Sequence, residues 1–348
     1  MIRRGLFGLA SIMGLSTLGL STLGLFTLGW GTVMAKEAPV LGKIVRLDPA
    51  LDRLVPPDAA IELLVENKFE WSEGPVWDAR HGRLLFSDIP RNMIWEWSET
   101  GGLKKFLQPS GYTGSAPFTG REPGSNGLAF NKAGDLLMCH HGDRRIAALS
   151  ADKFVTLADN YQGKRLNSPN DLVVKSNGDV YFTDPPYGLP KGEDDPGKEL
   201  DFQGVYRIAP GGELTLLTRE LSRPNGLAFS PDEQTLYVAN SDPDKAIVMA
   251  YPVKSDGTLG AGKVFFDATQ AAKEKQPGLP DGLKVSRDGT LWATAPGGVR
   301  VYSSAGKHLG TFATGVPTSN VAFGDDGSTL YMTADKNLVR VKTKVKGW

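Results

Sequence analysis

Six polar residues open similar short phrases along the chain: Glu73, Asn126, Asn170, Asn225, Asp281 and Ser319. Glycine follows in most copies, and three or four largely apolar residues come next. Carboxylate and amide oxygens are hard ligands that suit Ca²⁺, Mg²⁺ or Mn²⁺. Two carboxylates that meet in a partly dehydrated place repel each other unless a cation lies between them. These residue types therefore predict a divalent cation site if the fold gathers them. The alternative is that Asn-Gly and Asp-Gly only open strands, because they favour turns.

The spacing of the phrases, between 38 and 56 residues, is typical of the blades of a β-propeller. In the fourth copy we expect strands over 226–230, 235–240, 246–253 and 263–266. Six such units predict an all-β, six-bladed β-propeller with four antiparallel strands per blade. Equivalent strands in a ring point equivalent side chains the same way, so all six polar residues should converge at one mouth of the channel. Two stacked sandwiches, the alternative, would not require six copies.

The two ends of the chain predict how the ring closes. After Ser319 only three strands fit, over 321–323, 329–333 and 338–341, whereas one additional strand, 61–66, precedes the first phrase. We expect this N-terminal strand to complete the last blade, which hides sheet edges that would otherwise aggregate. The propeller then spans residues 61–348, after an extended arm over 36–60. Three long connections, 108–125, 186–204 and 268–280, are either functional lids or tolerated insertions.

Residues 1–35 are predicted to form a signal peptide. They contain no acidic residue, begin with Arg3 and Arg4, and continue as an apolar run that ends in a small-x-Ala pattern at 33–35. The match to a twin-arginine signal is partial. We expect a periplasmic or secreted protein with no membrane segment after removal of the leader. An uncleaved anchor is the alternative, because about 20 apolar residues suffice to span a bilayer.

The composition excludes several classes of function. The 39 basic and 39 acidic residues balance, so no basic surface for nucleic acid is expected. The single cysteine, Cys139, excludes an intrachain disulfide and a Cys-rich zinc site, and we expect it to be buried. There are four histidines, and His81 and His308 are expected at the surface, which argues against a three-histidine zinc site. No Gly-x-Ser-x-Gly elbow or phosphate-binding loop occurs.

Longer runs surround these positions, over 72–77, 84–90, 108–112, 139–145, 166–171, 182–188, 223–227 and 281–282. Together they resemble the gluconolactonase family, also called the SMP-30 or regucalcin-like family, from about Glu62 to Leu338. The resemblance implies that Glu73, Asn225 and Asp281 coordinate one divalent cation, Ca²⁺ first and Zn²⁺, Mg²⁺ or Mn²⁺ as alternatives. It places Asn170 beside the cation as a ligand or substrate contact. His140 stands where we would expect Glu or Gln, which leaves the role of this residue and His141 open.

The resemblance also implies a metal-dependent hydrolase that opens sugar lactones, with D-glucono-1,5-lactone as the first candidate. A cation on the lactone carbonyl oxygen polarises the carbon and stabilises the oxyanion that forms. We expect Asp281 to take the proton of the attacking water as the catalytic base, with a metal-bound hydroxide as the alternative. Substrate contacts are expected from Asn126, His141, Arg144, Asn170 and Tyr187. Arg144 equally suits a structural ion pair, and Tyr187 simple packing.

Two other functions remain open at this point. The same scaffold can hydrolyse other lactones or phosphotriesters, because a cation polarises P=O as well as C=O. A non-enzymatic propeller that binds a metal or ligand is the third reading, and it predicts a mouth blocked by a neighbouring loop. The sequence does not determine the oligomeric state.

Overall fold

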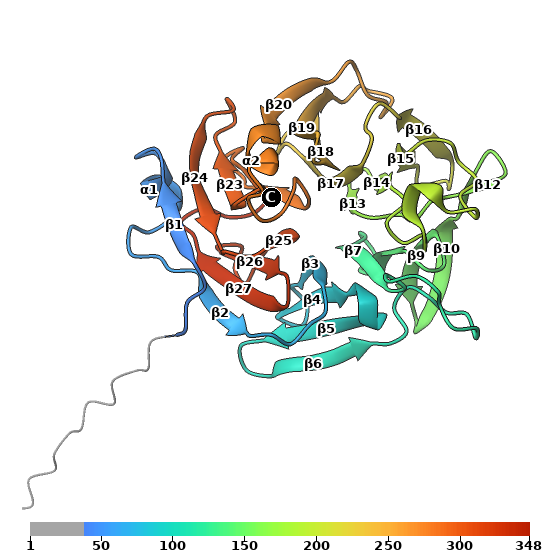
Figure 1. Ribbon diagram of the computed structural model, residues 1–348, viewed down its shortest axis with the longest axis horizontal. Coiled ribbons are helices and arrows are strands. Elements are labelled where there is room, and N and C mark those ends of the chain that lie inside the picture. The colour runs from blue at the N-terminus through green and yellow to red at the C-terminus, as the bar shows by residue number, and fades with distance from the viewer. Residues whose placement is uncertain (1–37) are drawn as a thin grey trace, which may run out of the picture. The chain divides into compact units, whose positions relative to one another are not determined.

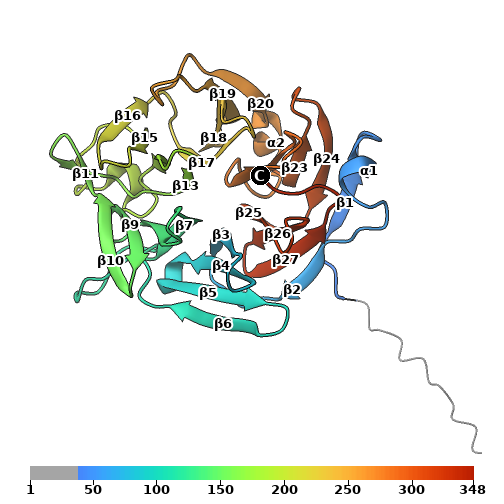
Figure 2. The ribbon, with the colours of Figure 1, turned by 180° about the vertical axis from the view of Figure 1, so that it is seen from behind.

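The computed structural model describes residues 38–348, so the predicted signal peptide lies outside the described residues. Six main sheets of antiparallel strands stand in a ring (Figures 1 and 2). This confirms the prediction of a six-bladed, all-β propeller. Chain order follows the ring, and the strand that starts each blade lies innermost.

The first three blades follow one another without exchange of strands. They consist of β3 (Ser72–Asp78), β4 (Arg83–Asp88), β5 (Met93–Ser98) and β6 (Gly102–Leu107); β7 (Ser125–Phe130), β8 (Leu136–His140), β9 (Arg145–Ser150) and β10 (Lys153–Ala158); and β13 (Leu172–Val174), β14 (Val180–Asp184), β15 (Gly204–Ile208) and β16 (Leu214–Thr218). A small separate hairpin, β11 (Asn160–Tyr161) and β12 (Lys164–Arg165), follows blade two.

Blades four to six repeat the same meander. They consist of β17 (Pro224–Phe229), β18 (Thr235–Asp242), β19 (Lys245–Pro252) and β20 (Lys263–Asp267); β21 (Leu283–Val285), β22 (Leu291–Ala295), β23 (Gly298–Tyr302) and β24 (His308–Ala313); and β25 (Asn320–Gly324), β26 (Thr329–Ala334) and β27 (Asn337–Lys342). The strands expected in the fourth and sixth units match these bounds to within two residues.

An N-terminal strand completes the sixth blade, as the sequence predicts. Strand β2 (Glu62–Val65) pairs antiparallel with β27, with Glu62 opposite Arg340. The Arg340 Nε atom donates a hydrogen bond of 2.7 Å to Glu62 Oε2. The first and last segments of the propeller are therefore joined by both backbone and side-chain bonds.

The segment before β2 differs from the extended arm that we expected. Strand β1 (Lys43–Arg46) pairs with β24 and gives blade five a fifth strand, so the prediction of four strands in every blade is wrong there. The short helix α1 (Leu51–Leu54) buries Leu51 and Leu54 in a cluster that includes Trp292 and Val339. The physical reason is the apolar content of the segment, which is stabilised by burial against blades five and six.

The faces of neighbouring blades pack through apolar and aromatic side chains. Tyr181 and Phe229, for example, meet edge to face across blades three and four, with ring centroids 4.9 Å apart. Cys139 is fully buried in the cluster between blades two and three, as expected, and burial raises the pKa of its thiol.

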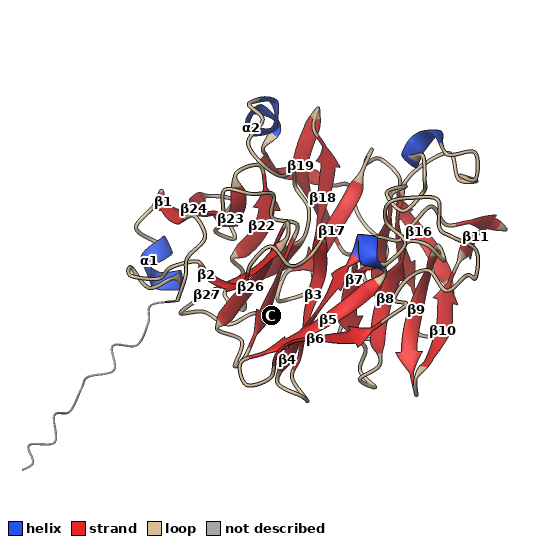
Figure 3. Cartoon of the chain, turned by 60° about the horizontal axis from the view of Figure 1, so that its bottom comes forward, coloured by secondary structure: helices blue, strands red, loops and turns tan. Residues whose placement is uncertain are grey.

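Only short helical segments interrupt the strands of the described chain. They are α1, α2 (Thr269–Lys273) and two single 3₁₀ turns, Ile89–Arg91 and Gly192–Asp194. Figure 3 shows α2 beyond one end of the strands. Within residues 38–348, no helix has the length and apolar character needed to span a membrane.

Candidate functional site

The inner strands of three blades are distorted where their polar residue stands. The pairing register shifts between Glu73 and Val76, and again beside Asn126 and Asn225 in the equivalent strands. Such a bulge leaves one residue outside the ladder and redirects its side chain. In blades three and five the polar residue lies just before the strand: the Asn170 amide donates to Thr183 O at 2.9 Å, and the Asp281 amide donates to Thr294 Oγ1 at 3.1 Å.

Five of the six predicted residues meet in one cavity of about 410 Å³. The shared lining consists of Glu73, Asn126, Asn170, Asn225 and Asp281, one from each of five blades. Ser319 is the exception, and our expectation that all six converge is wrong for it. Its hydroxyl donates a 2.6 Å hydrogen bond to Ser72 O and contacts Thr333, so it connects blades six and one, while its neighbour Thr318 lines the cavity.

Two carboxyl groups that line the cavity, those of Glu73 and Asp281, have strongly raised pKa values. Burial raises the pKa of Glu73 to about 8, and the nearby carboxyl of Asp171 adds to the shift. Burial and then repulsion from Glu73 raise the pKa of Asp281 well above its ordinary value. Without a cation between them, burial and mutual repulsion therefore favour the neutral forms of both groups.

Several oxygen atoms of the cavity lack hydrogen bonds. The side-chain Oδ1 atoms of Asn126, Asn170 and Asp281 are buried, and each lacks a partner within the described chain. The Asn225 Nδ2 atom donates to Ser241 Oγ at 2.9 Å, which leaves its Oδ1 as the atom available to a ligand. Buried acceptors without donors are costly, and a cation with hard-oxygen preference satisfies them. The donor set of the predicted ligands Glu73, Asn170, Asn225 and Asp281 thus fits a divalent cation of this kind.

The composition of this donor set differs from that of a site built from acidic residues, histidine or cysteine alone. Among residues 38–348, no group of three or more His, Cys, Asp or Glu side chains is placed to hold a metal ion. Here the inner-strand positions bring two carboxylates, Glu73 and Asp281, together with three asparagines. Such a mixed set favours Ca²⁺, Mg²⁺ or Mn²⁺ over Zn²⁺.

All three long connections contribute to the walls of the cavity. Glu122 comes from 108–125, Tyr187 from 186–204, and Gly278 and Leu279 from 268–280. These connections therefore shape the site. Of the two alternatives, functional segments or tolerated insertions, this placement favours functional segments. Burial raises the pKa of the Tyr187 phenol above its ordinary value, so the phenol stays protonated. Its hydroxyl has no hydrogen-bond partner in the described chain and is therefore free to donate.

The two histidines lie behind the site and not on its wall. His141 is fully buried, and its Nδ1 atom lies 3.3 Å from Glu122 Oε2, so it contacts a wall residue from behind. His140 is buried too, 3.7 Å from Asp143, and it packs edge to face on Phe154. His81 is exposed, as expected, and pairs with Asp78, whereas His308 is half-buried and contacts Gly310 O.

Arg144 holds the backbone and does not line the cavity. Its Nε atom donates to Leu166 O and Asn167 O at 2.7 and 3.0 Å, and its Nη1 atom donates to Gly197 O at 2.8 Å. The guanidinium is thereby bound to carbonyl groups of the segment before blade three and of the 186–204 connection. This geometry supports the structural role for Arg144 and not the expected substrate contact.

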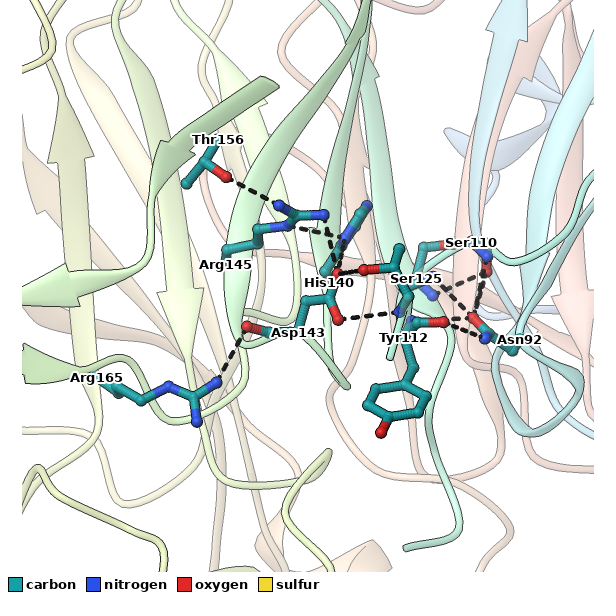
Figure 4. A network of polar contacts seen from close by, with 11 residues as sticks. Asn92, Ser110, Tyr112, Ser125, His140, Asp143, Arg145, Thr156 and Arg165 are labelled. Carbon is teal, nitrogen blue, oxygen red and sulfur yellow. Dashed lines mark hydrogen bonds and ion pairs between the residues drawn. The ribbon is translucent and has the colours of Figure 1, made fainter. Parts of the chain in front are cut away.

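A polar network fixes the 108–125 connection that carries Glu122 (Figure 4). Asn92 Oδ1 accepts the backbone amides of Ser110, Gly111 and Tyr112, at 3.0, 2.8 and 3.1 Å. Asp143 accepts two hydrogen bonds from Thr113 and one from Arg145. Sequence reasoning missed Asn92, Glu122 and the wall residue Trp71, because all three lie outside the six phrases.

A six-bladed propeller whose inner strands present carboxylate and amide oxygens to one buried cavity is the class of protein that this fold and site define. Residues 71–336 match the family model for the SMP-30/Gluconolactonase/LRE-like region, and the chain belongs to that family.

Individual relatives agree with this assignment. The chain is 41% identical over 319 residues to the gluconolactonase of Zymomonas mobilis, with 88% of each chain covered. The structure of a gluconolactonase from Xanthomonas campestris superposes with a TM-score of 0.75 at 32% identity, covering 89% of this chain and 99% of the other. Regucalcin of Agrobacterium tumefaciens, a calcium-binding protein, superposes with a TM-score of 0.64 at 21% identity, covering 82% and 94%, and supports the fold alone.

Proposed function

We propose that the protein is a cation-dependent lactonase that opens sugar lactones, first of all D-glucono-1,5-lactone to gluconate. The observation that carries this proposal is the cavity itself, in which two carboxyl groups with raised pKa values and three amide side chains converge. The relatedness to gluconolactonases names the substrate class. A volume of about 410 Å³ is of the size that encloses a small ligand.

The four expected ligands would hold the cation: Glu73, Asn170, Asn225 and Asp281. When bound, a divalent cation supplies Lewis acidity, which polarises a lactone carbonyl and stabilises negative charge on its oxygen. Ca²⁺ is the proposed ion, because oxygen ligands from carboxylates and amides suit it.

Asp281 is the proposed base. Its carboxyl lies on the cavity wall with an Oδ1 atom that lacks a hydrogen bond from the described residues, so it can accept a proton from an attacking water. Burial and the Glu73 charge raise its pKa in the cavity without a cation, and a bound cation would favour the carboxylate form that a base requires. Asp281 therefore has two proposed roles, as a ligand of the cation and as the base that accepts the proton.

The remaining wall residues position the sugar. The Tyr187 hydroxyl is protonated and unpartnered, so it can donate to a ring oxygen or hydroxyl. Asn126 offers a buried Oδ1 acceptor to a sugar hydroxyl, and Asn170 does the same where it is not occupied by the cation. His141 acts through Glu122, which it contacts at 3.3 Å, and not on the sugar directly.

We also propose that the protein acts outside the cytoplasm, in the periplasm or after secretion. The support is the apolar N-terminal segment with its two arginines and its small-x-Ala ending at 33–35. N-terminal sequencing of the protein recovered from the host would place the cleavage, expected after Ala35.

A second candidate substrate is a larger lactone, such as that of an oxidised disaccharide. The specific observation is a second cavity of about 990 Å³ that shares Trp71, Glu122 and Tyr187 with the first. A second sugar ring would have room there, beside Trp71. The non-enzymatic reading predicts a blocked mouth, and the open volume of both cavities counts against it.

The test is a hydrolysis screen of purified protein with Ca²⁺, Mg²⁺, Mn²⁺ or Zn²⁺ and with a chelator. The substrates are D-glucono-1,5-lactone, a pentonolactone, a disaccharide lactone and a phosphotriester, each with a buffer blank. We expect glucono-1,5-lactone to be opened fastest, with Ca²⁺ giving the highest rate and the chelator abolishing turnover. Rates equal to the blank with every cation would overturn the proposal, and a faster disaccharide lactone would favour the second candidate.

A further inference from the structure

The position that follows each polar residue forms a second layer of the channel. It is glycine in four blades, Gly74, Gly127, Gly226 and Gly282, but Asp171 in blade three and Asn320 in blade six. Blades three and six stand opposite each other in a ring of six. The side chains of Asp171 and Asn320 are both buried. Neither residue lines the cavity described above, so both lie beneath it.

These two side chains meet across the channel and reach a proposed cation ligand. Asn320 Nδ2 donates to Asp171 Oδ2 at 3.3 Å and to Glu73 Oε2 at 3.4 Å. The orientation of the amide is determined, because its Oδ1 atom accepts the backbone amide of Val321 at 2.8 Å. The other Asp171 oxygen, Oδ1, accepts the Leu172 amide at 2.8 Å.

The glycines of the second layer provide the space for this bridge. A Cβ atom at Gly282 would overlap the side-chain amide of Asn320, and one at Gly127 would overlap the Asp171 carboxylate. Neither glycine has a positive φ, so the backbone conformation alone would tolerate alanine at both places. Glycine is needed here because the side chains of two other blades fill the channel axis.

We propose that Asn320 and Asp171 form the floor of the cation site and act as positioning residues for Glu73. Asn320 and the Gly74 amide, which donates at 2.8 Å, hold Oε2 of the Glu73 carboxylate and leave Oε1 to the cation, while Asp171 holds Asn320. The inference rests on the proposed cation site. Replacing a group that orients a metal ligand typically costs about 10- to 100-fold in metal affinity.

The test is calorimetric titration of Ca²⁺ into the full chain and into the variants Asn320→Ala and Asp171→Asn. Asn320→Ala removes the donor, and Asp171→Asn places an amide where two donors require a carboxylate. We expect both to bind Ca²⁺ about tenfold or more weakly. At saturating Ca²⁺ we expect kcat to recover to within about threefold of the parent value, because the base Asp281 is retained. A merely structural role would lower kcat at every Ca²⁺ concentration instead.

A matched pair of glycine variants provides the control. Gly282→Ala should weaken Ca²⁺ binding as Asn320→Ala does, because it displaces the same amide. Gly211→Ala should leave binding unchanged, since no described atom lies within 4 Å of a Cβ placed there. If Asn320→Ala fails to fold, the Ca²⁺ affinities of Asp171→Asn and Gly282→Ala test the positioning role instead.

The outcomes separate this inference from the proposed function. If the parent protein binds no cation, the proposed site itself is wrong. If the parent binds Ca²⁺ while Asp171→Asn and Gly282→Ala bind it within about twofold of the parent, the floor has no positioning role and the inference is overturned.

Discussion

Single hydrogen bonds decide what each asparagine offers to the site. Asn225 commits its amide nitrogen to Ser241 and so presents oxygen to the cavity. Asn320 commits its oxygen to the Val321 amide and so presents nitrogen to two carboxylates. The same residue type therefore acts as an acceptor in one layer of the channel and as a donor in the layer below.

Replacement of the proposed base, Asp281, tests the mechanism at a single residue. Asp281→Asn removes the proposed base, so we expect turnover of glucono-1,5-lactone to fall by about 10²- to 10⁴-fold. The fold should survive, because the change removes a buried carboxyl that repels Glu73. Steady-state kinetics at saturating Ca²⁺, together with thermal unfolding, would measure both effects.

Asp326→Asn is the matched control, because Asp326 lies exposed in a turn outside the cavity lining, where it contacts Lys346 and Ser328. Its turnover should equal that of the parent protein. Undiminished activity of Asp281→Asn would remove Asp281 from the mechanism.

The perturbed carboxyl groups also predict how cation binding depends on pH. Burial raises the pKa of Glu73 to about 8, so below that pH a bound proton must leave before the cation enters. Affinity for Ca²⁺ should therefore rise with pH up to about 8 and level off above it, by up to about tenfold per pH unit for each proton displaced. Calorimetry between pH 6 and 9 in buffers of different ionisation enthalpy would count the protons. A flat profile over this range would contradict the assigned role of Glu73.

At the scale of elements, the long connections matter more than the blades that carry them. Asn92 has a left-handed backbone conformation, φ 53°, and its side chain anchors three successive amides of the 108–125 connection. Asn92 thus fixes the first part of the connection that carries Glu122. The bulges at the inner strands, by contrast, need no such support because the ladder on either side fixes them.

Asn92→Gly tests this anchor without straining the backbone, because glycine adopts a positive φ freely. We expect a stability loss of about 1–3 kcal/mol from the unpaired amides. The KM for glucono-1,5-lactone should rise several-fold with a smaller change in kcat, since a wall of the cavity loosens.

Asp152→Gly provides the comparison for this change. Asp152 also has a left-handed conformation, φ 62°, but it lies in the turn between β9 and β10, outside the cavity lining. Its KM should not change. Equal KM values for the two variants would show that the anchor does not shape the cavity.

For the whole molecule, closure of the ring is the decisive contact. Strand β2 ties the N-terminal segment to β27, and the preceding segment only covers the outside of blades five and six. A chain that begins at Asn67 lacks β2 and leaves an open edge on β27, so we expect it to aggregate or to lose cooperative unfolding.

A chain that begins at Asp58 keeps β2 and loses β1 and α1. It should still form the closed ring, with a lower melting temperature because Leu51, Leu54 and Val55 no longer cover the core. Size-exclusion chromatography and thermal unfolding would compare the two truncated chains. Equal melting temperatures for the two truncated chains would show that β2 does not stabilise the closed ring.

The sequence by itself determined the repeat, the six blades, the closing strand and the convergence of five polar residues. The physical reason is that equivalent positions of similar blades in a ring face the same end of the channel. The convergence of residues such as Asn126 and Asn225 can therefore be predicted from the repeat alone. The family resemblance, confirmed by the match over 71–336, rested on the same local runs.

Tertiary structure alone decided where individual side chains point and what they contact. Ser319 occupies the equivalent position but bonds to Ser72, which lies 247 residues away, and Arg144 bonds to carbonyl groups of two connecting segments. The fifth strand of blade five and the wall residue Glu122 likewise depend on segments that have no repeat partner. Such contacts depend on how segments that are distant in the sequence pack against one another. A local sequence pattern does not contain that information.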